Sequence, residues 1–435
     1  MNFSKQQLVI FGGIGLLILV LILVFAGILP GSKTSTNNPA NTQGSLTMWI
    51  YGDQPSFYNQ AIAAFNTTYP HVKVDIRTFG DYGTYSQALL EAMASGQAPD
   101  IFMIPSTELP TYFNKIVPVS SALFSPFNLQ QDFPAVVYQD FVSGQYVYGL
   151  PLSLDTMALF YNKDLLAKAG IVYPPATWQD FDRIVPSLTQ ISSTGTIDQA
   201  AAAIGTSNAN IDHATDLLSL LMLQTGTTIT DAAKNQATFA VDTGFNAFKF
   251  YTQFSDPKNN LYTWNYNMPD SLDAFATNKV AMIFDYESAV NQLKAKNSFL
   301  NYGIAPVPQP ASSTAYVSYP NYAGFVVSKQ SRYQSLAWTL ILSMATNAQN
   351  ANSYITASGN PPALLSLIQG RLQDPNLSVF AKQALYARSW YGPNRTSIAS
   401  VLSQMIDAYV TGQTSLQTAV KEAANQVTSI MNSGL

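Results

Sequence analysis

The sequence contains 435 residues, of which 47% are apolar and only 11% are charged, against about 25% charged residues in an average soluble protein. This length and apolar content suffice for one large or two medium domains, whereas the net charge of -4 without a basic run argues against a nucleic-acid partner. Cysteine is absent, and the only histidines, His71 and His213, lie far apart, so we expect surface or capping histidines and no disulfide, metal site or cofactor.

The first predicted element is an apolar segment, Leu8–Leu29, that contains no charged residue. About 20 apolar residues in a helix cross the hydrocarbon core of a membrane, whereas the apolar part of a secretory signal has only about 7 to 15. We therefore predict an uncleaved transmembrane signal anchor, with residues 1–7 as a cytoplasmic tip and residues 30–45 as a flexible linker. The rest would lie on the extracellular or periplasmic side of the cell membrane. The alternative is a cleaved signal followed by a disordered N-terminus.

The next part of the chain alternates between strand and helix patterns. Strands are predicted at Leu46–Asp53, Val72–Phe79 and Pro99–Ile104, and helices at Pro55–Pro70 and Tyr85–Gly96. Gly96 is expected to end the second helix, and Asp100 to accept backbone N–H groups at the start of the third strand. This order predicts a parallel α/β domain with right-handed crossovers.

The stretch Gly149–Gly170 has a strand-like pattern with an acid, Asp155, in its middle, and becomes helical near Tyr161. Asn162 is a plausible N-cap and Gly170 a plausible C-cap of that helix. Thr177 is the expected N-cap of the helix that comes after it.

The remaining chain is predicted to be mostly helical, with three further strands. The helices are expected at Trp178–Thr189, His213–Gln224, Gly244–Phe254, Ser271–Thr277 and from Ser335 onward, and the strands at Lys279–Asp285, Tyr302–Pro308 and Tyr322–Ser328. Strands that return after a long helical region indicate that the chain crosses between two lobes more than once.

The order of these motifs resembles the extracellular solute-binding proteins of ABC importers, in the group that includes maltose-binding protein. The motifs are "LTMWIYGD", "LLEAMASGQAPDIFMI", "FATNKVAMIF", "NYGIAPVPQP" and "AGFVVSK". The most specific piece is "YGLPLSLDTMALFYNKDLLAKAGIVYPPATWQDF", where the Tyr-Asn-Lys-Asp helix entry and the Pro-Pro-x-Thr-Trp turn occur together. The resemblance covers nearly all of the chain after residue 45.

The resemblance implies an α/β fold with two lobes joined at a hinge, like that of periplasmic binding proteins. The first lobe would contain residues 46–153 and 283–321, and the second residues 154–282 and 322–435. A solute would be enclosed as the lobes close, and ABC permease transmembrane subunits would accept it. The resemblance implies no enzymatic activity.

Candidate ligand contacts come directly after the strands, because ligands of α/β lobes bind beyond the carboxyl ends of the strands. This rule selects Tyr51, Asp53, Ser106, Asp285, Tyr286 and Glu287. The resemblance to maltose-binding protein implies that Asp53, in a Gly-Asp loop, contacts sugar hydroxyls, and it implies a similar role for Asp155 at the cleft floor.

Aromatic faces are expected to pack on a sugar ring. The sequence departs from the family here, because Ile104 and Ser288 stand where stacking tryptophans are expected. The candidate aromatic contacts are therefore Tyr286, Tyr322, Trp264, Trp390 and Tyr391. These departures argue against maltodextrin as the ligand but leave a sugar possible.

Several functions agree with the sequence. The first is a membrane-anchored carbohydrate receptor that serves an ABC permease. Others are the same fold binding a polyamine or another cation through its acids, a solute sensor, an extracellular hydrolase with two carboxylates, and an α/β protein without an assignable role.

Overall fold

The computed structural model describes residues 39–433. Their backbone falls into two compact units, residues 39–45 with 66–73 and residues 46–65 with 74–433. The predicted signal anchor, Leu8–Leu29, and the tip before it lie outside the described residues. Within residues 39–433, none of the helices has the length and apolar character needed to cross a membrane.

The first five-stranded sheet has the strand order β2-β1-β3-β14-β4. Its strands are β1 (Gln43–Tyr51), β2 (His71–Phe79), β3 (Ile101–Pro105), β4 (Ile116–Val117) and β14 (Ala323–Ser328). β1 and β3 run parallel, as predicted, whereas β14 runs antiparallel to β3 and places Phe325 opposite Met103. β3 is buried along its whole length, as expected for a strand covered on both faces.

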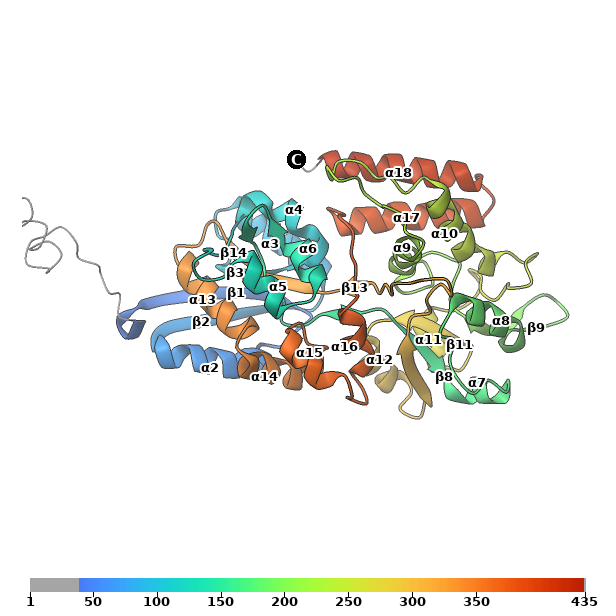
Figure 1. The fold of residues 1–435 in the computed structure, drawn as a ribbon, viewed down its shortest axis with the longest axis horizontal. Helices are drawn as coiled ribbons and strands as arrows, with labels where there is room; N and C mark the ends of the chain where they lie inside the picture. Colours follow the sequence, from blue (N-terminus) through green and yellow to red (C-terminus); the bar gives the residue numbers. More distant parts are fainter. Residues whose placement is uncertain (1–38, 434–435) are drawn as a thin grey trace, which may run out of the picture. The chain divides into compact units, whose positions relative to one another are not determined.

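Helices and a short hairpin accompany this sheet, and together they are called the first lobe (Figure 1). The helices are α2 (Asn59–Thr68), α3 (Tyr82–Ala94), α4 (Leu109–Tyr112), α5 (Pro126–Asp132), α6 (Ala135–Phe141), α13 (Gln334–Ala345), α14 (Ala348–Ser358) and α15 (Leu365–Arg371), and the hairpin is β5 (Val142–Ser143) with β6 (Tyr146–Val147). Gly96 comes after α3 with a φ of +73°, the left-handed conformation expected after a helix. Asp100 binds the neighbouring strand, where Thr47 N–H donates to its carboxylate at 2.8 Å.

The second five-stranded sheet has the order β12-β8-β11-β10-β9. Its strands are β8 (Ala158–Asn162), β9 (Gln190–Ile191), β10 (Ile197–Ala202), β11 (Val280–Asp285) and β12 (Tyr302–Pro306). β10 and β11 are parallel, whereas β8 is antiparallel to both β11 and β12. β10 has no counterpart among the predicted strands.

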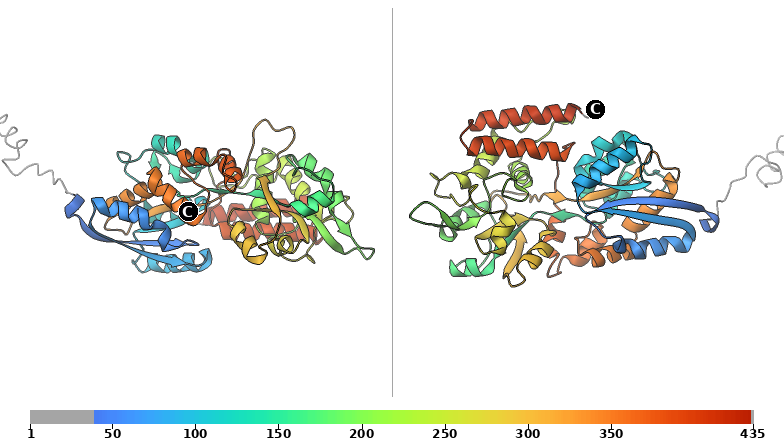
Figure 2. Two further views of the ribbon diagram at one scale, coloured as in Figure 1. Left: turned by 90° about the horizontal axis from the view of Figure 1, so that it is seen from below. Right: turned by 180° about the vertical axis from the view of Figure 1, so that it is seen from behind.

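The helices around this sheet complete the second lobe. They are α7 (Lys163–Lys168), α8 (Trp178–Leu188), α9 (Ala214–Gln224), α10 (Asp242–Thr252), α11 (Ser271–Ala276), α12 (Ala289–Lys296), α17 (Arg395–Val410) and α18 (Leu416–Ser433). The predicted caps are confirmed: Asn162 accepts the N–H groups of Asp164 and Leu165, and Thr177 accepts that of Asp180. α17 and α18 lie side by side (Figure 2).

Short irregular helices add single turns to both lobes. They are the 3-10 helices η1 (Pro39–Asn41), η2 (Pro55–Tyr58), η3 (Ser106–Glu108), η4 (Phe113–Lys115) and η5 (Gln253–Ser255). η3 begins at the residue after β3 ends, so the polar side chains of Ser106 and Glu108 lie directly beyond the carboxyl end of that strand.

Two short strands pair where the chain passes from one sheet to the other. β7 (Asp155–Thr156) is antiparallel to β13 (Pro320–Asn321), with Asp155 opposite Asn321. After α16 (Ser378–Ala384), residues 385–394 lead to α17, and Ser318 forms a bridge with Ala387. The chain therefore leads to the second sheet at β7, to the first at β13, and to the second again before α17.

The predicted lobe boundaries are corrected by these pairings. β12, which lies in residues 283–321, pairs with β8 in the second sheet, and β14, which lies after residue 322, pairs with β3 in the first. The prediction placed each of them in the opposite lobe. Their partners lie far away in the sequence, so the local pattern of either strand contains no information about its sheet.

Candidate functional site

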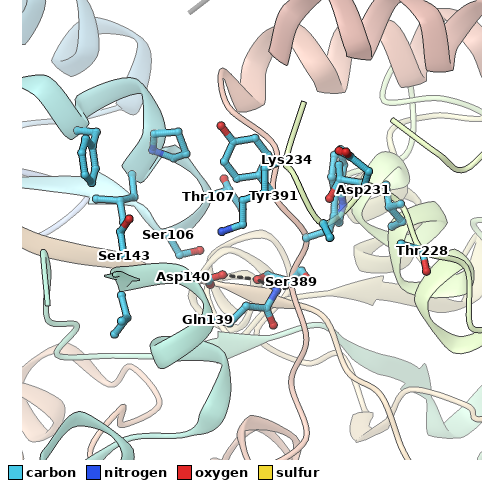
Figure 3. A pocket seen from close by; sticks show the side chains of 18 of the residues that line it. Ser106, Thr107, Gln139, Asp140, Ser143, Thr228, Asp231, Lys234, Ser389 and Tyr391 are labelled. Carbon is cyan, nitrogen blue, oxygen red and sulfur yellow. Dashed lines mark hydrogen bonds between the residues drawn. The ribbon is translucent and has the colours of Figure 1, made fainter. Parts of the chain in front are cut away.

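A cavity of about 640 Å³ is lined by side chains from both lobes. The first lobe contributes residues of η3, α4, η4 and α6, and the second contributes the loop 227–234 and residues 389–391. Figure 3 shows this space, which is called the Ser389 cavity. Its volume lies within the range of about 300–1,000 Å³ that is typical of small-molecule sites.

Asp140, on α6, is the central acid of the Ser389 cavity. Its carboxylate accepts hydrogen bonds from the Ser389 hydroxyl and, at 2.7 Å, from the Tyr322 hydroxyl. Gln139 donates to the Ser389 carbonyl at 2.8 Å, so two neighbouring residues of α6 hold the segment that carries Ser389 (Figure 3). Loss of solvation by burial raises the pKa of Asp140 to about 7, although hydroxyl donors oppose this shift.

Three aromatic residues line the Ser389 cavity, namely Phe113 from the first lobe and the neighbouring Trp390 and Tyr391. Trp390 is 8% exposed, and its buried indole nitrogen has no hydrogen-bond partner in the described part of the chain, residues 39–433. Tyr391 is half-buried and lies under the ammonium of Lys234, which is 5.3 Å from the ring centroid. The cavity therefore offers an aromatic ring, a cation and a free indole donor.

A second cavity, of about 700 Å³, lies around Arg395 and is called the Arg395 cavity. Tyr51, at the end of β1, and Pro105, at the end of β3, line its wall from the first lobe. Asp216 of α9 and Arg395 of α17 line it from the second. A space of about 20 Å³ is lined both by these two residues and by Thr107 and Trp390 of the Ser389 cavity, so the two cavities adjoin.

Arg395 connects the two lobes through charged and polar contacts. Its guanidinium donates to Asp216 at 2.8 Å and to Asn321 of β13 at 2.9 Å. Its backbone N–H donates to the buried Glu108 of η3 at 3.1 Å. Tyr286 also donates to the Asp216 carboxylate, at 2.9 Å. The Asp216 carboxylate raises the pKa of Arg395, so the guanidinium stays charged.

His213 lies beside this network, at the N-cap position of α9 and on the wall of the Arg395 cavity. Its Nε2 is 3.5 Å from the carboxylate of Asp285, the last residue of β11. Burial lowers the pKa of His213 and raises the pKa of Asp285 to about 8. Both groups are therefore favoured in their uncharged forms near neutral pH.

Four predicted ligand-binding acids, Asp53, Asp155, Asp285 and Glu287, lie outside both cavity walls. Asp53 accepts hydrogen bonds from the hydroxyls of Tyr58 and Tyr354. Asp155 accepts the backbone N–H of Thr156 at 2.8 Å, and burial raises its pKa. Burial also raises the pKa of Glu287, to about 7. A role for these acids in ligand binding stays a prediction.

The predicted aromatic contacts have different surroundings. Trp264 has no exposed surface and belongs to the hydrophobic core of the second lobe, so the prediction of a ligand-facing ring is wrong for this residue. Tyr286 is also fully buried and contacts two residues of the Arg395 cavity wall, Asp216 and His213. Tyr322 lies behind the wall of the Ser389 cavity and contacts Asp140. Ser106, Trp390 and Tyr391 line that cavity directly.

Several side chains of these cavities were not predicted from the sequence, namely Gln139, Asp140, Asp216, Lys234, Ser389 and Arg395. Asp140 lies on α6, a helix that was not predicted, and Lys234 lies in a polar loop with no motif. Ser389 could have been found from the sequence, because it lies in the segment Arg388–Pro393 next to the predicted aromatic contacts Trp390 and Tyr391. Among residues 39–433, no cluster of three histidine, aspartate or glutamate side chains has a metal-binding arrangement.

Comparisons with known proteins agree with this architecture. Residues 60–378 match the family model of the bacterial extracellular solute-binding protein. A maltodextrin-binding protein of Bacillus subtilis is 25% identical over 94% of this chain and 95% of its own length. A galactooligosaccharide-binding protein of the same organism is 24% identical over 78% of this chain and 77% of its own length.

Solved structures show the same fold. The sugar-binding protein MalE from Xanthomonas citri superposes with a TM-score of 0.73, at 20% identity, over 89% of this chain and 98% of its own. A solute-binding protein from Thermotoga lettingae, bound to α-D-tagatose, has a TM-score of 0.70 at 22% identity and covers 90% of this chain and 100% of its own. This likeness shows the two-lobed α/β fold of periplasmic binding proteins.

Proposed function

Because the chain belongs to the family of bacterial extracellular solute-binding proteins, we propose that it binds a sugar or oligosaccharide between its lobes and delivers it to an ABC transporter permease. The relatives named for maltodextrin and galactooligosaccharide binding support the choice of a sugar. The proposal includes no catalytic step.

The observation that carries the proposal is the composition of the Ser389 cavity. Hydroxyl, amide and carboxylate groups line it together with the aromatic rings of Trp390 and Tyr391. Polar groups of this kind bind sugar hydroxyls, and aromatic rings pack against the apolar face of a sugar ring. Its volume of about 640 Å³ leaves room for more than one sugar unit.

Lobe closure is the proposed mechanism of solute capture. Both cavities have walls from both lobes, so a ligand in either one would contact both lobes at once. A ligand with more contacts in the closed arrangement shifts the population toward it. Arg395, which already contacts Glu108 and Asn321, would be part of the closed arrangement.

The N-terminal segment completes the proposal. Leu8–Leu29 would anchor the protein in the cell membrane as a single-pass helix, and residues 30–45 would tether the binding lobes on the extracellular or periplasmic side. A tethered receptor stays close to its permease, which raises the effective concentration of the pair.

A polyamine ligand has less support than a sugar. Such a ligand needs carboxylates that are free to pair with ammonium groups. Asp53 and Asp155 instead accept hydrogen bonds from their own chain, and Asp285 accepts the N–H of Tyr286 at 2.7 Å. A solute sensor is the other alternative, and it would bind the same sugar without delivering it to a permease. Sugar uptake measured in cells with and without the protein distinguishes a sensor from a transport protein.

Titration calorimetry on the full-length chain tests the proposal. Neutral mono- and oligosaccharides are titrated against the wild type, Tyr391→Ala and the control Tyr173→Ala, whose side chain is 81% exposed and lines neither cavity. We expect sugar binding that Tyr391→Ala weakens about tenfold, because an aromatic contact contributes about 0.5–1.5 kcal/mol besides its buried area. Binding of polyamines with no binding of any sugar would contradict the proposal.

A further inference from the structure

The two carboxylates that line the Ser389 cavity, those of Asp140 and Asp231, already accept hydrogen bonds from the protein itself. The two carboxylate oxygens of Asp140 accept the hydroxyls of Ser389 and Tyr322. The Oδ1 atom of Asp231 accepts the backbone N–H groups of Asn235 and Gln236, both at 2.9 Å. Both oxygens of Asp140 and one oxygen of Asp231 thus accept hydrogen bonds within the protein.

Two buried groups of the same cavity that can donate lack a hydrogen-bond partner among residues 39–433. They are the indole N–H of Trp390 and the hydroxyl of Thr107. Lys234 forms no ion pair within residues 39–433. A buried donor without a hydrogen-bond partner destabilises the folded state, because it has lost its bonds to water and gained none in return. A ligand that supplies acceptor atoms here would therefore give these two donors the hydrogen bonds that they lack within residues 39–433.

The backbone of a turn places Lys234 in this cavity. Its N–H donates to the Asp231 carbonyl at 3.0 Å, and its φ is +58°, a conformation that residues other than glycine seldom adopt. The ammonium lies 5.3 Å from the centroid of the Tyr391 ring. Lys234, Tyr391 and Thr107 all line the cavity (Figure 3). Among residues 39–433, the one cation of the lining thus lies beside an aromatic ring, in a cavity that Trp390 and Thr107 also line.

We propose that the Ser389 cavity takes a sugar that carries an acidic group, whose anionic oxygens bind the ammonium of Lys234 together with the free donors of Trp390 and Thr107. Anionic oxygens accept stronger hydrogen bonds than hydroxyl oxygens do, and an ammonium without a counter-ion favours them further. The inference rests on the proposed function and specifies its substrate class. The acidic group is the carboxylate of a uronate unit or a phosphate ester, which share this chemistry.

Calorimetry with matched disaccharides tests the inference on the full-length chain. Gluco, galacto and manno disaccharides are each compared as the neutral sugar, the uronate and the 6-phosphate. The variants are Lys234→Met, which removes the charge, Lys234→Arg, which keeps it, and the control Lys258→Met. Lys258 is exposed and lines neither cavity. Thermal unfolding of each variant confirms that it is folded.

The expected result is that an acidic disaccharide binds at least about tenfold more tightly than its neutral counterpart. Lys234→Met should weaken the acidic ligand roughly 10- to 100-fold, the range for one lost charge-assisted hydrogen bond. The same variant should weaken a neutral ligand much less, and Lys234→Arg should keep most of the affinity for the acid. Tight binding of only the uronate, or only the phosphate, identifies the source of the charge.

Neutral disaccharides that bind as tightly as acidic ones would overturn the inference and leave the proposed function intact. Equal losses for acidic and neutral ligands in Lys234→Met would overturn it as well, because the lysine would then act through shape or stability. Failure of every sugar, neutral and acidic, would instead contradict the proposed function itself.

Discussion

Replacement of Arg395 by methionine would test the contact between Arg395 and Asp216. Methionine keeps much of the length of the arginine side chain and removes its charge and its hydrogen bonds. The Asp216 carboxylate would lose its 2.8 Å guanidinium partner and keep the Tyr286 hydroxyl at 2.9 Å. We expect a lower free energy of unfolding, because a largely buried carboxylate would remain without its counter-ion.

The exposure of the two side chains sets the magnitude of this loss. The Asp216 side chain is 11% exposed and the Arg395 side chain is 31% exposed. Removal of one partner costs about 3–5 kcal/mol for a fully buried pair, whereas exposed pairs contribute about 0.2–1 kcal/mol. The partial exposure of Arg395 reduces the first figure, so we expect a loss of about 2 kcal/mol. The control pair is Arg183 with Asp180, which lie 2.7 Å apart at 74% and 36% exposure.

The assay is chemical denaturation of the full-length chain, monitored by circular dichroism, for a double-mutant cycle. The cycle combines Arg395→Met with Asp216→Asn, and Arg183→Met serves as the exposed control. We expect a coupling of at least about 1 kcal/mol between the first two and a loss below about 0.5 kcal/mol in the control. Additive effects at Arg395 and Asp216, or equal losses in Arg395→Met and Arg183→Met, would refute the reasoning.

Two further predictions concern stability. Burial raises the pKa of Asp285 to about 8, whereas the unfolded chain releases this proton at its own lower pKa. The contribution of Asp285 to the free energy of unfolding is therefore fully present below the unfolded pKa and is lost as the pH rises toward 8. The free energy of unfolding of Asp285→Asn should therefore rise relative to that of the wild type by up to about 1.4 kcal/mol per pH unit between pH 5 and pH 7. Denaturation at several pH values measures both proteins, and parallel pH profiles would contradict the prediction. Gly324→Ala should lower the free energy of unfolding by about 1–3 kcal/mol, because its Cβ would lie 2.4 Å from the ring of Phe141. Gly80→Ala, whose Cβ would meet nothing within 4 Å, should change it by less than about 0.5 kcal/mol, and similar losses in both variants would exclude a steric cause.

The local elements were largely predictable because their causes lie within a few residues. Asn162 and Thr177 cap their helices through N–H groups two or three residues ahead, which a sequence pattern contains in full. β3 is a continuous apolar run, and its burial is a consequence of that pattern. β10 (Ile197–Ala202) was missed, because its small residues carry no strand preference and its pairing with β11 determines its conformation.

The candidate site was predicted only in part, since its polar contacts join distant segments. Ser106, Trp390 and Tyr391 were identified from strand ends and aromatic motifs, and they line the Ser389 cavity. Their partner Asp140 was missed, because its contact with Ser389 spans 249 positions of the chain. A pattern over a few residues contains no trace of such a pairing.

The sequence by itself determined much of the alternation of strands and helices, the helix caps at Asn162 and Thr177 and the resemblance to a family, all of which depend on neighbouring residues. Only the tertiary structure decided which acids meet a cavity. Asp53, predicted to bind ligand, has its carboxylate occupied by Tyr354, 301 positions away, whereas Asp216, which was not predicted, binds Arg395 on a cavity wall. The physical reason is that burial and hydrogen bonding of a side chain depend on residues brought together by folding, and these residues are not neighbours in the sequence.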